Sequence, residues 1–126
     1  MIVSINRDGV CMGDDAMDHR REITLTDNAT GRDLLEKLQE IHYLPDQTGA
    51  VWYTGSLNAK CVVAWSCKKK KIIAELKDVP LVQIDGDKTW YDFRYAWSKD
   101  GLNILKDAIR NTPGIWYDKD FFGGHL

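Results

Sequence analysis

The side chains best suited to chemistry lie close together between residues 10 and 21. This segment holds a thiol, three carboxylates and an imidazole, from Cys11, Asp14, Asp15, Asp18 and His19. Carboxylate oxygens with one imidazole suit Mg²⁺, Mn²⁺ or Ca²⁺ better than Zn²⁺, so the three acids and His19 are candidate metal ligands. The spacing matches neither an EF-hand loop nor a metalloprotease helix, and acidic loops are usually solvated. We therefore predict no bound metal and no other cofactor.

Cys11 and His19 could also act as a nucleophile and its base, with one of the neighbouring acids orienting the imidazole. A cysteine between Val10 and Met12 is, however, typical of a small buried hydrophobic residue. We therefore predict no catalytic residue. An enzyme that depends on Cys11 and His19, or a metal-binding protein centred on the same loop, stays open as the alternative function.

The chain is rich in aromatic residues, with five tryptophans, five tyrosines and three phenylalanines. Most of them are expected in the core, but five lie where exposure is plausible: Trp90, Trp116, Tyr117, Phe121 and Phe122. Rigid aromatic rings beside Asp and Arg are typical of protein-binding surfaces, and stacking on a sugar is the alternative use. Together with Asp14 and Asp15, which could dock a basic partner, these five residues are the predicted partner-binding set.

Charge and composition exclude several kinds of partner. Lys and Arg total 17 against 19 for Asp and Glu, so the net charge of -2 favours neither nucleic acid nor an anionic membrane. The four lysines 68–71 are expected to be a solvated turn. No apolar run approaches the roughly 20 residues that a membrane span needs. Three cysteines, two of them in one predicted strand, favour reduced thiols, and we predict a cytoplasmic protein of undetermined oligomeric state.

One predicted helix is the element around which the rest of the chain is expected to be organised. Thr30 is expected to cap its first turn, with Asp33 completing a capping box. Apolar residues at helical spacing follow, namely Leu34, Leu35, Leu38 and Ile41, and Pro45 ends the helix after Leu44.

Strands are predicted on both sides of this helix, at 1–6, 22–26, 50–53, 60–67, 72–76, 81–84 and 90–97, and a second helix at 98–110. The pattern predicts a single α+β domain over residues 1–126. It has a mainly antiparallel sheet, one long helix packed on that sheet and a second, C-terminal helix. Residues 115–126 are expected to be a tail that can be flexible.

The first third resembles the opening of the ubiquitin-like β-grasp. The likeness lies in the strands 1–5 and 23–25 and in a helix followed by Leu44-Pro45-Asp46-Gln47. Gly123-Gly124 resembles the processed tail of ubiquitin-like modifiers, although Phe121-Phe122 departs from that pattern. The resemblance implies a modifier as one alternative function. The segment 10–15 is also similar to a segment of small uncharacterised bacterial proteins, a likeness that implies no activity.

The sequence is best interpreted as a non-catalytic cytosolic module that binds another protein. An immunity-type inhibitor of a bacterial toxin, or a similar accessory factor, fits its size, acidity and aromatic surplus. Neither nucleic acid nor a membrane is expected as a partner.

Overall fold

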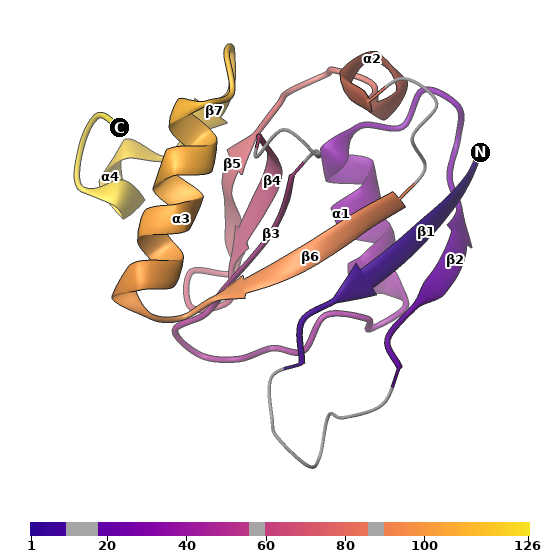
Figure 1. Ribbon diagram of the computed structural model, residues 1–126, viewed down its shortest axis with the longest axis horizontal. Helices are drawn as coiled ribbons and strands as arrows, with labels where there is room; N and C mark the ends of the chain where they lie inside the picture. The colour runs from indigo at the N-terminus through magenta and orange to yellow at the C-terminus, as the bar shows by residue number, and fades with distance from the viewer. Residues whose placement is uncertain (10–17, 56–59, 86–89) are drawn as a thin grey trace.

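The computed structural model describes residues 1–9, 18–55, 60–85 and 90–126. Within these ranges the chain forms a seven-stranded sheet and four helices (Figure 1). The strands are β1 (Ile2–Arg7), β2 (Arg21–Thr24), β3 (Val51–Gly55), β4 (Cys61–Ser66), β5 (Lys71–Glu75), β6 (Trp90–Ala96) and β7 (Trp116–Tyr117). The helices are α1 (Gly31–Glu40), α2 (Leu81–Asp85), α3 (Lys99–Arg110) and α4 (Lys119–Phe122).

The sheet has the strand order β2-β1-β6-β3-β4-β5-β7. Strand β6 joins two antiparallel units, because it pairs in parallel with β1 on one side and antiparallel with β3 on the other. In the parallel pair, Ser4 lies beside Trp90 and Asn6 beside Asp92. The N-terminal strand therefore contacts a strand that comes more than eighty residues later in the chain.

Helices cover both faces of this sheet, and each face has its own apolar core. On the α1 face, Leu34, Leu35 and Leu38 pack with apolar side chains of the sheet and of α2. On the α3 face, Leu105 and Ile109 pack over β4 and β5. In Figure 1, α3 and α4 lie on one side of the strands and α1 lies on the other.

Local chemistry explains where α1 begins. The Thr30 side chain accepts a hydrogen bond from the backbone N–H of Asp33, and the Asp33 carboxylate accepts one from the N–H of Thr30. This capping box satisfies two of the backbone donors that every helix start leaves unpaired. The helix ends at Glu40, and His42 just beyond it has a positive φ of 55°. The predicted cap is therefore confirmed, and the helix is ten residues long.

The predicted fold class is wrong in two respects. The sheet is mixed rather than mainly antiparallel, because β1 and β6 run in parallel. No long helix packs on it either, since all four helices are short and the longest of those described, α3, has twelve residues. A parallel contact between segments so far apart in sequence has no local pattern to reveal it.

The strand predicted at 81–84 is also wrong, because these residues form α2. Leu81 is fully buried and Ile84 is partly buried, and both pack in the core of the α1 face. Residues three apart lie on the same side of a helical turn. A short apolar run fits one helical turn as well as it fits a strand, so periodicity alone could not decide between them.

Candidate protein-binding surface

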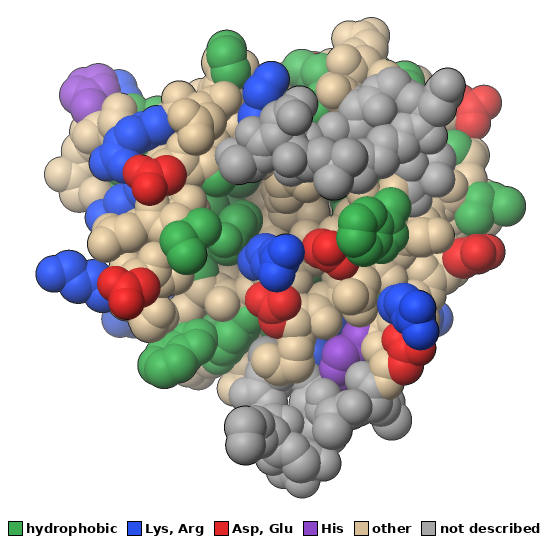
Figure 2. Space-filling view, viewed as in Figure 1, with side chains coloured by type: hydrophobic (Ala, Val, Ile, Leu, Met, Phe, Trp, Pro, Cys, Tyr) green, Lys and Arg blue, Asp and Glu red, His purple; other side chains and the backbone are tan. Residues whose placement is uncertain are grey.

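One half of the α3 face is not covered by any helix that the structure describes. Helix α3 packs over β4 and the end of β6, which leaves the side chains of β2, β1 and the start of β6 at the surface. We call this surface the open face, and it comprises Ile2, Ser4, Glu22, Thr24, Trp90 and Asp92. Figure 2 shows hydrophobic, acidic and basic side chains interspersed on the side of the molecule that it presents.

The open face carries two large apolar side chains close together. Trp90 is 45% exposed and Ile2 is 61% exposed. Ser4 lies beside Trp90 in the parallel pair, and Ile2 comes two residues before Ser4 on the same side of β1. Side chains at such diagonal positions are within reach of an aromatic ring. Ile2 and Trp90 therefore form a small apolar centre with polar neighbours around it.

Charged and aromatic groups border this centre on the side toward α3. Arg94 lies beside Tyr53 in the β3–β6 pair, and its guanidinium is 3.8 Å from the Asp8 carboxylate. The other oxygen of Asp8 accepts a hydrogen bond of 3.0 Å from the backbone of Tyr95. Nearby, Oδ1 of Asp92 is buried and has no hydrogen-bond partner within the described part of the chain. Exposed Trp beside Tyr and Arg is the composition that dominates binding energy at protein interfaces.

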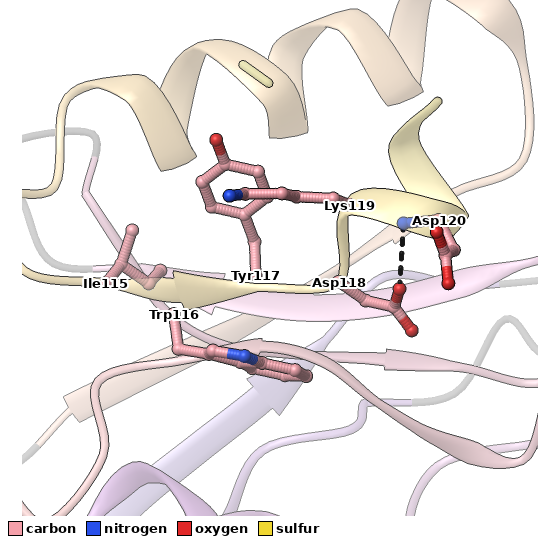
Figure 3. A pocket seen from close by; sticks show the side chains of 6 residues that line it. All are labelled: Ile115, Trp116, Tyr117, Asp118, Lys119 and Asp120. Atoms are coloured by element: carbon pink, nitrogen blue, oxygen red, sulfur yellow. Dashed lines mark hydrogen bonds between the residues drawn. The ribbon is translucent and has the colours of Figure 1, made fainter. Parts of the chain in front are cut away.

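Trp116 belongs to a different surface, at the edge strand β7. It lies beside Glu75 of β5, whose carboxylate binds Arg32 of α1, so its indole is on the α1 face. The Lys77 ammonium lies 4.7 Å from the centre of the indole ring. Figure 3 shows Trp116 and Tyr117 pointing to opposite sides of the strand. Trp90 and Trp116 are therefore on opposite faces, and the structure does not bring them together.

A depression of about 440 Å³ lies at this edge, lined by residues 115–120. Its main polar feature is the Asp118 carboxylate, which caps α4 by accepting hydrogen bonds from the N–H groups of Asp120 and Phe121. The Lys71 ammonium lies 2.5 Å from the same carboxylate and, with those N–H groups, lowers the pKa of Asp118 below its ordinary value. The carboxylate is thus fully engaged in holding α4 in place.

The other aromatic residues near the C-terminus pack inward. Tyr117, Phe121 and Phe122 contact the core on the α3 face and also contact one another edge to face. Gly123 ends α4 with a positive φ of 76°, a conformation that favours glycine. The N–H of Gly124 donates a hydrogen bond of 2.8 Å to the carbonyl of Lys119. Both glycines therefore have a structural role in the turn that closes α4.

The predicted loop chemistry falls largely outside the described residues. Cys11, Asp14 and Asp15 are among the residues that the structure does not describe. The Asp18 carboxylate is held by the Arg20 guanidinium at 2.8 Å, which lowers the pKa of Asp18 to about 2. The carbonyl of His19 accepts a hydrogen bond from the Tyr43 hydroxyl. Over residues 1–9, 18–55, 60–85 and 90–126, no group of three His, Cys, Asp or Glu side chains could hold a metal ion.

The two described cysteines are free and buried. Burial raises the pKa of Cys61 to about 12 and also raises the pKa of Cys67. Both side chains are therefore neutral thiols at physiological pH, and neither is an activated nucleophile.

Sequence patterns indicated only part of the open face. Trp90 was a predicted contact residue, whereas Ile2 and the bordering residues Tyr53 and Arg94 were not. Val3 and Ile5 alternate toward the core, which puts Ile2 on the other side of its strand. The exposure of Ile2 could have been predicted from this pattern.

No family model matches the chain, and no curated protein or solved structure matches it. Among the described residues, no helix is both long enough and apolar enough to cross a membrane.

Proposed function

We propose that this protein is a non-catalytic module that binds another protein through the open face. The observation that carries the proposal is the exposure of Trp90 and Ile2 at diagonal positions on the neighbouring strands β6 and β1. An accessory factor or an inhibitor of the immunity type is the kind of protein that would use such a surface.

The open face is the better candidate for the binding surface than the β7 edge, because a partner could bury more apolar surface there. Trp90 is about half exposed, Ile2 lies at the diagonal position, and polar side chains surround both. Protein interfaces have the same arrangement, with an apolar centre inside a polar rim. At the β7 edge, by contrast, Trp116 already packs against Lys77, and the neighbouring aromatic rings are committed to the core. The open face therefore offers more apolar surface that is free to be buried by a partner.

We further propose that the protein works in the cytoplasm. Cys61 and Cys67 are free thiols in the structure, and cysteines that stay reduced are typical of cytosolic proteins.

The test is capture of partners from a lysate of the native organism on the immobilised protein. Wild type is compared with Trp90→Ala and with the matched control Trp97→Ala, which removes a tryptophan that is 68% exposed beyond the open face. A central Trp in an interface contributes at least about 2 kcal/mol, so Trp90→Ala is expected to weaken capture roughly thirtyfold. A partner that both variants retain equally well would refute the proposal.

A further inference from the structure

A cleft of about 460 Å³ opens on the α1 face, on the opposite side of the sheet from the open face. Its walls come from the end of α1, from the loop 42–46, from β3 and β4, and from the turn before β5. The volume lies within the range of small-molecule sites, which is roughly 300–1,000 Å³.

Trp65 of β4 is one of the residues that line the cleft. Strand β4 is central, and every one of its other five side chains is buried, yet Trp65 is partly exposed. Its neighbour in the β3–β4 pair is Trp52, which is 1% exposed and donates a hydrogen bond of 2.8 Å from Nε1 to the carbonyl of Pro45. Of the two tryptophans that line the cleft, Trp65 is therefore the one with accessible surface to offer to a ligand.

The shortness of α1 leaves this ring uncovered. Gln39 in the last turn of the helix and His42 just beyond it both line the cleft. The helix therefore ends at the rim, and the chain turns away through the positive φ of His42.

The rim supplies donors and acceptors with little net charge. The Lys70 ammonium lies 3.1 Å from the Asp46 carboxylate, and both side chains are more than two-thirds exposed. Gln39 adds an amide and His42 an imidazole, and each of these can both donate and accept a hydrogen bond. The carboxylate and the ammonium neutralise each other, so the rim favours an uncharged ligand over an ion.

We infer that this cleft binds a neutral sugar, with one face of a pyranose ring stacked on Trp65. The axial C–H groups of a pyranose present an apolar, slightly positive face that suits the negative face of an indole. Its hydroxyls donate and accept, which matches the Asp46 carboxylate and the Lys70 ammonium held side by side. A flat heteroaromatic ring is best held between two rings, and here Trp52 is buried and leaves one open ring.

The experiment is a titration of the ¹⁵N-labelled full chain, followed through the Trp indole N–H signals and the Gln39 side-chain amide. The probes are glucose, galactose, mannose and N-acetylglucosamine, with adenine and indole as the planar rivals. At least one sugar is expected to shift the Trp65 and Gln39 signals until they saturate. The expected Kd is about 1 mM, because only one aromatic ring and a few solvent-exposed polar groups contribute to binding. Saturation by adenine or indole alone would overturn the inference, as would no shift with any sugar.

Two variants decide whether the binding uses this cleft. Trp65→Val keeps a strand-forming residue on β4 and is expected to lower the affinity for the sugar at least about tenfold. Asp46→Asn changes a side chain that is 68% exposed, and a threefold to tenfold loss of sugar affinity is expected because one charged acceptor is removed. The matched control Trp97→Val should bind as wild type does. The site would be refuted if Asp46→Asn and a folded Trp65→Val protein both bound the sugar with the affinity of the wild type.

Discussion

Replacement of Gly31 by alanine tests how closely α1 approaches the sheet. A Cβ at this first residue of the helix would lie 2.6 Å from Cγ1 of Val62 and 3.1 Å from the Val62 carbonyl oxygen. Val62 is fully buried on β4, and its carbonyl accepts a hydrogen bond of 3.1 Å from the backbone N–H of Leu76. The helix or the strand would therefore have to move.

Two effects of opposite sign determine how much Gly31→Ala changes the free energy of unfolding. Alanine is favoured over glycine in a helix by up to about 1 kcal/mol. Overpacking a tight contact costs about 1–3 kcal/mol, and here the contact is with backbone as well as with a stiff β-branched side chain. We expect Gly31→Ala to lower the free energy of unfolding by about 1–2 kcal/mol. At roughly 2.1 cal/mol/K per residue, the unfolding entropy of 126 residues is about 0.26 kcal/mol/K, so the Tm should fall by about 4–8 °C.

The assay is urea and thermal unfolding followed by circular dichroism, with Gly101→Ala in α3 as the matched control. The nearest atom to a Cβ at Gly101 is the Cα of Ala96 at 3.3 Å, so only a small adjustment is needed. This control is expected to be neutral or to gain about 0.5 kcal/mol from helix propensity. A Gly31→Ala protein as stable as the control would refute the close packing of α1 on β4.

Two further predictions concern buried ionisable groups. The Glu75 carboxylate is 3% exposed and receives two hydrogen bonds from Arg32, so Arg32→Met should lower the free energy of unfolding by about 2 kcal/mol in a urea titration. The control Lys37→Met, which removes an ion pair to the 71% exposed Glu40, should lower it by less than about 0.5 kcal/mol. Equal effects of the two substitutions would contradict the buried pair. Burial raises the pKa of the Cys61 thiol from 9.0 to about 12, so this thiol ionises first in the unfolded chain. The free energy of unfolding should therefore be unaffected by Cys61 below about pH 9 and should fall as the pH rises toward 12. Between about pH 8 and pH 10.5, the urea midpoint should fall less in Cys61→Ala than in wild type, and parallel curves would contradict this.

Local signals in the sequence predicted local structure well. The Thr30 cap, the apolar stripe of α1 and the second helix, predicted at 98–110 and found at Lys99–Arg110, all depend on residues within a few helical turns. The structure confirms each of them, because capping and amphipathic burial need no knowledge of the rest of the chain.

The arrangement of the sheet could not be predicted in this way. The contact of β1 with β6 and the addition of β7 beyond β5 depend on pairing between distant segments, which leaves no periodic trace. The same limit applies to the candidate surface. Exposure of Trp90 was predicted from its place in the chain, but its proximity to Ile2 follows only from the parallel pairing. That Trp116 lies on the opposite face likewise depends on its register with Glu75.

The central position of β6 has a consequence for synthesis on the ribosome. The β1–β2 hairpin and the β3–β4–β5 meander can each form early, but the edges of β1 and β3 that face β6 stay unpaired until residues 90–96 emerge. Bare edges of this kind template intermolecular pairing. Nascent chains that stall before residue 90 should therefore depend on chaperones, and completion of this one strand should release them.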